Sequence, residues 1–288
     1  MTEPTTHTLD APGAVLSYDV RSNDASTRPV LLLIGSPMGA DGFVTLAGHF
    51  TDRTVVTYDP RGAGRSKRTD GASETAVKEH ADDLHRLIEA LDAGPADILA
   101  SSGGAVNALA LAARHPEQVR TLVAHEPPAA QELPDREQAL AVCDGIKQTY
   151  LREGFGPAMA KFIALVSHDG PIPDGYADQP GPDPAMFGLP TVDDGSRDDA
   201  LLCLNMPSCP AYRHDFAALR AAPCRIVIGV GAESSRMLAG RAGIAVAERL
   251  GTSPVTFPGG HDGFLGGEYG GMGKPDEFAA TLREVLND

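Results

Sequence analysis

The chain has 288 residues, a hydrophobic content of 42% and a formal net charge of −15. These values are typical of a globular protein with a sizeable core, and the acidic balance argues against nucleic acid and anionic membranes as partners. The cysteines show neither a CxxC pair nor metal-ligand spacing, so we expect free thiols in a reducing compartment, with a Cys203–Cys209 bridge as the alternative. They are Cys143, Cys203, Cys209 and Cys224.

The first 13 residues are polar and lack the apolar segment of a signal peptide. No later apolar run is long enough to span a bilayer. We therefore expect a cytoplasmic protein whose N-terminal segment is a polar tail, with the first strand at residues 14–20.

Apolar runs alternate with amphipathic segments along most of the chain. Strands are predicted at 14–20, 30–34, 53–58, 98–99, 119–124, 225–230 and 254–257, and helices at 74–92, 105–114, 235–250 and 275–286. Between 129 and 220 the strands disappear, and helical patches near 136–152 and 157–167 precede a Pro, Gly and Asp-rich segment at 169–195. This pattern predicts a mostly parallel α/β sheet, the core (1–128 and 221–288), with an inserted helical cap (129–220).

The segment Ala100-Ser101-Ser102-Gly103-Gly104 connects a predicted strand to a predicted helix. A nucleophile elbow needs small residues two positions before and after its serine, because the turn is sharp and strained. Centring the motif on Ser101 would place Leu99 at a position that must be small. Ser102 is therefore the predicted nucleophile.

Several chemically capable residues follow predicted strands, and the carboxyl ends of parallel strands share one edge of a sheet. They are residues 35–39, Ser102, Glu126, residues 231–233 and His261. A serine hydroxyl needs a base to remove its proton, and histidine suits this role near neutral pH. Of the nine histidines, His261 is the one that follows both a strand and a Gly-Gly turn near the C-terminus, so it is the predicted base.

Gly35-Ser36-Pro37, residues 59–66, the Ser102 elbow, Gly259-Gly260-His261 and the cap placement together resemble the α/β-hydrolase superfamily. The resemblance implies the chain order serine, acid, histidine. It also implies a structural role for Asp59 and Arg61, which shape a turn behind the active site.

The oxyanion hole is expected from two backbone amides. One belongs to Gly103, after the nucleophile, and the other to Ser36, with Met38 as the alternative. The family pattern here is His-Gly-x-Pro, and Ile34 replaces its histidine. Gly35 and Met38 are expected to contact the substrate, together with the cap residues Met159, Phe162, Met186 and Phe187, for which cap packing is the alternative.

Two glutamates compete for the role of acid. Glu126 follows the strand after the elbow helix, and Glu233 follows the strand after the cap. The run from Ser101 to Pro127 is similar to the zearalenone lactonases, which carry a glutamate at the earlier position. We therefore favour Glu126 and keep Glu233 as the alternative acid.

The predicted activity is hydrolysis of a hydrophobic carboxylic ester or lactone through a Ser-His-Glu triad, with zearalenone as the most specific candidate substrate. No cofactor and no metal are expected, because no His, Asp and Glu cluster or phosphate-binding glycine motif is present. The alternatives are a carbon–carbon bond hydrolase, a perhydrolase, or a small-ligand receptor without turnover. A homo-oligomer is compatible with the sequence.

Overall fold

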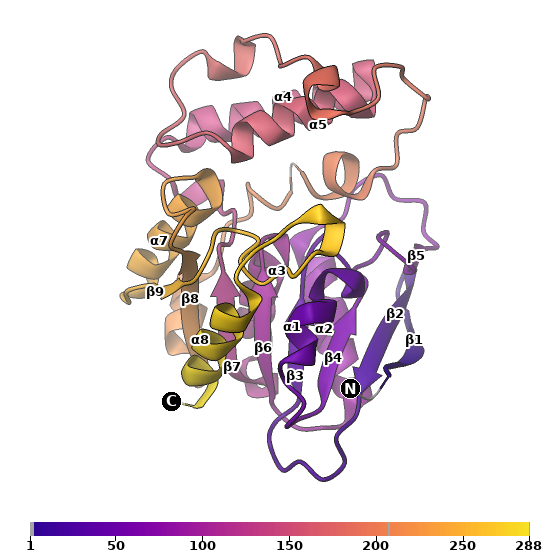
Figure 1. The fold of residues 1–288 in the computed structure, drawn as a ribbon, viewed down its shortest axis with the longest axis vertical. Helices are drawn as coiled ribbons and strands as arrows, with labels where there is room; N and C mark the ends of the chain where they lie inside the picture. Colours follow the sequence, from indigo (N-terminus) through magenta and orange to yellow (C-terminus); the bar gives the residue numbers. More distant parts are fainter. Residues whose placement is uncertain (1–2, 207, 288) are drawn as a thin grey trace.

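A mostly parallel sheet forms the centre of the protein, which this computed structural model describes over residues 3–206 and 208–287 (Figure 1). Its strand order within these residues is β1-β2-β4-β3-β6-β7-β8-β9, and β5 pairs with β2. The pairs among β3, β4 and β6 to β9 are parallel, whereas β1, β2 and β5 join the edge in antiparallel pairs. The strands are β1 (Thr5–Ala11), β2 (Ala14–Arg21), β3 (Leu31–Ile34), β4 (Val55–Tyr58), β5 (Lys67–Arg68), β6 (Ala96–Ser101), β7 (Val119–His125), β8 (Arg225–Gly231) and β9 (Val255–Phe257).

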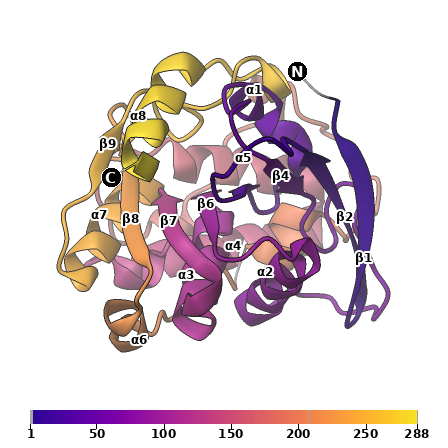
Figure 2. The ribbon, with the colours of Figure 1, turned by 90° about the horizontal axis from the view of Figure 1, so that it is seen from below.

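Helices cover both faces of this sheet, as Figure 2 shows. α1 (Val44–Gly48) and α8 (Pro275–Asn287) pack on one face, and α2 (Val77–Leu91), α3 (Gly103–Arg114), α6 (Phe216–Ala221) and α7 (Leu238–Leu250) pack on the other. The continuous apolar strands follow from this, because alternate residues of one strand enter different cores. Leu31 and Leu33 join the cluster under α1 and α8, while Leu32 and Ile34 join the opposite cluster.

The N-terminal segment corrects one expectation. The prediction of a polar tail is wrong for Thr5–Ala11, because this segment forms strand β1 and pairs with β2. Five of its seven residues are exposed, and Leu9 is the side chain of this strand that packs against the core. An edge strand of this kind lacks the apolar pattern by which buried strands are identified.

The cap lies over the carboxyl ends of the parallel strands (Figure 1). It contains α4 (Arg136–Glu153), α5 (Phe155–Val166) and a short π-helix, η6 (Ala200–Asn205). These elements share a hydrophobic cluster of their own, which includes Leu238 and Ala242 of α7. At the end of the region assigned to the cap, Phe216 and Leu219 of α6 pack instead in the core cluster below. All four cysteines are free, Cys203 and Cys209 included.

Candidate active site

The elbow places Ser102 between β6 and α3 with φ 57° and ψ −130°. This backbone conformation is strained for a residue with a side chain and costs roughly 1–3 kcal/mol. Gly104 is required here, since a Cβ on it would lie 2.6 Å from the carbonyl oxygen of Ile34. Ser102 is partly exposed, while Ser101 is buried with its hydroxyl 3.5 Å from Nδ1 of His125. The accessible hydroxyl of the pair is thus that of Ser102.

Glu126 and His261 meet although 135 residues separate them, with 2.7 Å between Nδ1 of His261 and Oε2 of Glu126. Glu126 follows β7 and adopts φ 47°, which is unusual for a non-glycine residue. Its backbone N–H donates to the carbonyl of Gly229, 2.9 Å away. The elbow is tied to the same strand end, because the Ser102 N–H donates to the carbonyl of His125 over 3.0 Å. Serine, acid and histidine therefore lie at one edge of the sheet.

The carboxylate of Glu126 is fully buried and accepts three hydrogen bonds. Besides His261, its donors are the N–H of Gly231 at 2.9 Å and the hydroxyl of Ser234. Burial acts to raise the pKa of Glu126, but the hydrogen bond and charge of His261, the charge of His125 and the Ser234 hydroxyl lower the pKa to about 2. Glu126 is therefore ionised at neutral pH and holds the Nδ1 proton of His261, which leaves Nε2 unprotonated in the neutral ring.

The other candidate acid lies elsewhere. Glu233 is exposed, and its Oε1 lies 2.6 Å from Nζ of Lys274 in a surface ion pair. The structure thus brings Glu126 to His261 and pairs Glu233 with a lysine.

The residues predicted for the oxyanion hole are in close contact. Gly103 begins α3, and a Cβ on it would lie 2.5 Å from the carbonyl oxygen of Ser36. Ser36 itself is buried. Gly35 is equally restricted, because a Cβ added to it would lie 2.6 Å from the carbonyl oxygen of Met38. The loop after β3 therefore lies directly against the first residue after the proposed nucleophile.

The side chains predicted to contact the substrate are spread over two regions. Met38 is partly buried against the core under α1 and α8. Met159 and Phe162 are partly buried against the cap cluster. Met186 and Phe187 are 77% and 40% exposed, on a 3-10 turn of the cap (Pro184–Phe187). Their contact with a substrate stays a prediction.

The motif at residues 59–66 has the contacts of a structural element. The Asp59 carboxylate accepts from the Ala40 N–H at 2.8 Å and from Nε of Arg65 at 2.7 Å. Arg61 forms a buried bidentate pair with Asp83, over 2.7 and 2.6 Å. The bond from Ala40 fixes the loop after β4 against the turn that follows β3, and the Arg61–Asp83 pair fixes the same loop against α2.

Ser234, whose hydroxyl donates to the Glu126 carboxylate, is not among the residues predicted from the sequence. The sequence feature that could have identified it is the spacing Gly231-Ala-Glu-Ser234, which puts an N–H donor at the end of β8 and a hydroxyl donor in the turn that follows.

Within residues 3–206 and 208–287, no three His, Cys, Asp or Glu side chains are grouped to hold a metal ion. In the same part of the chain, every helix is too short or too polar to cross a membrane.

The fold and the site define an α/β hydrolase. A family model described as the alpha/beta hydrolase fold matches residues 28–175. YraK of Bacillus subtilis (strain 168), described as an uncharacterized hydrolase, is 32% identical over 265 residues, which cover 89% of each chain. The chain therefore belongs to the α/β-hydrolase family, which confirms the predicted fold and supports the predicted enzyme class, a hydrolase.

Solved structures agree with this fold. An enol-lactonase from Burkholderia xenovorans LB400 has a TM-score of 0.68 at 16% identity, over 98% of this chain and 100% of that chain. A structure of carboxylesterases from Nitrososphaera gargenis also has a TM-score of 0.68, at 17% identity and with the same coverage. At these identities the likeness shows the fold alone.

Proposed function

We propose that this protein is a serine hydrolase that cleaves a hydrophobic carboxylic ester or lactone. The observation that carries the proposal is the buried Glu126 carboxylate on Nδ1 of His261, at the same sheet edge as the strained Ser102. This is the arrangement of a nucleophile, a base and an orienting acid. The esterase and lactonase names of the structural neighbours agree with this substrate class.

In the proposed reaction, Ser102 Oγ attacks the acyl carbon while His261 Nε2 takes the serine proton. The carbonyl oxygen becomes an oxyanion, and the N–H groups of Gly103 and Ser36 stabilise it. His261 then gives its proton to the leaving alkoxide. In the second half, His261 takes a proton from a water that attacks the acyl–Ser102 ester, and it returns this proton to Ser102 Oγ as the carboxylic acid product leaves. Glu126 stays ionised and stabilises the imidazolium.

The proposal is tested by hydrolysis of an ester and lactone panel by the wild type and Ser102→Ala. Zearalenone belongs in the panel, because the acid at the Glu126 position is the feature that resembles the zearalenone lactonases. We expect turnover by the wild type and a loss of about 10⁶-fold in kcat for Ser102→Ala, with the fold intact by circular dichroism. Appreciable activity of the variant would refute the role of Ser102. If the wild type does not turn over, labelling with a fluorophosphonate separates a wrong substrate class from a protein that only binds.

A further inference from the structure

One turn of the cap contacts both residues proposed to form the oxyanion hole. Asn205 ends the π-helix η6, and its Oδ1 lies 3.5 Å from the hydroxyl oxygen of Ser36. Four residues later, the Cys209 N–H donates to the carbonyl of Asn205 over 3.0 Å. The Cys209 thiol is buried beside Gly103, where a Cβ would lie 3.4 Å from its sulfur. The cap thus lies against each of the two proposed oxyanion donors.

The Asn205 side chain has a fixed orientation. Its Nδ2 donates to the carbonyl of Ala200 at 2.8 Å, so Oδ1 is the atom that faces His80 and Ser36. Nε2 of His80 lies 3.1 Å from Oδ1 and must carry the proton, because an amide oxygen can only accept. The Ser36 hydroxyl has to donate for the same reason.

His80 supplies a rigid and uncharged support for this arrangement. It is 1% exposed, and its pKa is lowered to about 4 by burial together with the charges of Arg61 and Arg68, although the hydrogen bond to Asn205 opposes the shift. The ring is therefore neutral at pH 7. Its Nδ1 has no hydrogen-bond partner among the described residues, so Asn205 is the group that fixes the ring through a hydrogen bond.

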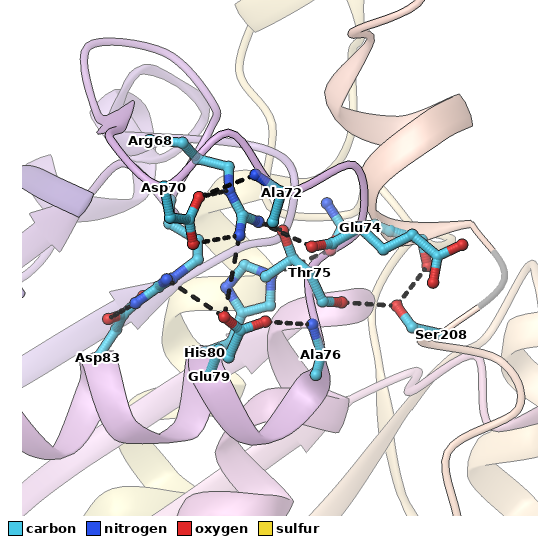
Figure 3. A network of polar contacts seen from close by, with 12 residues as sticks. Arg68, Asp70, Ala72, Glu74, Thr75, Ala76, Glu79, His80, Asp83 and Ser208 are labelled. Carbon is cyan, nitrogen blue, oxygen red and sulfur yellow. Dashed lines mark hydrogen bonds and ion pairs between the residues drawn. The ribbon is translucent and has the colours of Figure 1, made fainter. Parts of the chain in front are cut away.

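The same part of the cap is attached to the core next to His80. The Thr75 N–H donates to the carbonyl of Leu204 over 3.1 Å, and the Ser208 hydroxyl donates to the carbonyl of Thr75 over 2.8 Å. Figure 3 shows the bond between Ser208 and Thr75 within the polar network around Arg68, in which His80 is also drawn. Asn205 lies in sequence between these two bonds, so its position depends on how the cap is seated.

We propose that Asn205 is a positioning residue that connects the cap to the oxyanion hole. It holds the Ser36 side chain, so that the Ser36 N–H faces the reacting carbonyl oxygen. This role rests on the proposed function, since it acts on an oxyanion formed at Ser102. A π-helical turn next to the site agrees with it, because such turns are frequent at functional sites. The cap then completes the catalytic machinery in addition to covering it.

The test uses Asn205→Ala, Ser36→Ala and the double variant, with p-nitrophenyl butyrate as substrate and an alkyl trifluoromethyl ketone as inhibitor. The ketone adds the serine hydroxyl to form an oxyanion, so its Ki measures the hole directly. Ser36→Ala removes the hydroxyl and keeps the N–H. Misplacing one donor should lower kcat/KM and raise Ki by the same factor, about tenfold, in each single variant. KM should stay within about twofold, and the double variant should add no further loss because both changes break one contact.

Cys203→Ala is the matched control, because it removes a side-chain hydrogen bond of the same π-helix, from the Cys203 thiol to the Ser73 carbonyl over 3.7 Å, and leaves the side-chain bonds of Asn205 in place. Its kcat/KM and Ki should stay within about twofold of the wild type. Titration with a fluorophosphonate gives the active fraction of every sample, so a variant that merely unfolds shows a smaller fraction with an unchanged Ki. The positioning role would be overturned if Asn205→Ala had a smaller active fraction with an unchanged Ki, or if the losses of the two single variants added up in the double variant. If Asn205→Ala does not fold, an unchanged Ki in Ser36→Ala overturns it. A wild type that the fluorophosphonate does not label at Ser102 would overturn the proposed function itself.

Discussion

Two loops leave adjacent parallel strands of this sheet, and each carries a glutamate. Glu126 follows β7, is fully buried and has φ 47°. Glu233 follows β8, is exposed and pairs with Lys274. The β8 loop nevertheless contributes to the site, because its Gly231 and Ser234 donate to the carboxylate of Glu126. One loop supplies the proposed acid, and the other supplies two of the groups that donate hydrogen bonds to it.

This difference shows that position after a strand is not enough to make an acid useful to His261. The carboxylate must turn inward and its oxygens must find donors, because an unsatisfied buried charge is costly. Glu126 meets both conditions. Glu233 remains in water, where solvent screens its ion pair with Lys274 and leaves it little effect on stability.

In the comparison of the two glutamates, the largest effect is expected from Glu126→Gln. The glutamine amide would present its N–H₂ group, or an oxygen without charge, to His261, and the tautomer that leaves Nε2 free would lose its stabilisation. We expect kcat for the best ester to fall by up to about 10⁴-fold, with little change in KM.

Glu233→Gln is its matched control, because it removes the same charge from the neighbouring loop and breaks only an exposed ion pair. Its kcat should stay within about twofold of the wild type. The opposite ranking of the two variants would assign the acid to Glu233 and contradict the role of Glu126.

The second effect is on stability in acid. The folded-state pKa of Glu126, about 2, lies below its ordinary value of 4.5, so ionised Glu126 stabilises the fold by about 3 kcal/mol relative to an unperturbed carboxyl. This contribution is complete above about pH 4.5 and is lost as the pH falls toward 2. Urea unfolding of the wild type and Glu126→Gln at several pH values measures it. A difference between the two proteins that stays constant from pH 7 to pH 3 would contradict the lowered pKa.

The sequence predicts the core of the fold well, for a physical reason. The central residues of strands β3, β4, β6, β7 and β8 are buried, so each of these strands contains the short apolar run that is typical of a strand covered on both faces. The elbow is equally visible, since a glycine is required where Gly104 meets the carbonyl of Ile34. Strand β1 could not be found, because its side chains are mostly exposed.

The choice between the two glutamates could not be made from the residues alone. Both follow parallel strands that pair in register, Ala124 opposite Ile228 and His125 opposite Gly229. What separates them is the backbone of Glu126 and the donors on the next loop, and neither can be derived from periodicity. The contact of Asn205 with Ser36 is harder still to predict, since 169 residues separate them and the short turns of the cap have no sequence pattern that fixes their position on the core.

The smallest effect in this comparison is expected from Ser234→Ala, which removes one of the three donors to the Glu126 carboxylate. A hydrogen bond to a charged group contributes about 1.5–3 kcal/mol, so the free energy of unfolding at pH 7 should fall by about 2 kcal/mol. The pKa of Glu126 should rise toward its ordinary value, because the hydroxyl helps to lower it. A less firmly held acid orients His261 less well, and we expect kcat to fall about tenfold.

Ser235→Ala is the control for this variant, since Ser235 supplies none of the three bonds to Glu126. Both variants shorten a serine in the same turn, so a loss of activity in Ser234→Ala alone isolates the bond to the carboxylate. If the activity is kept while the stability falls, the β8 loop would serve folding only, and Gly231 and His261 would be sufficient to hold the acid. If activity and stability fall together, and the free energy of unfolding depends less on pH in acid, the β8 loop determines how well Glu126 orients His261.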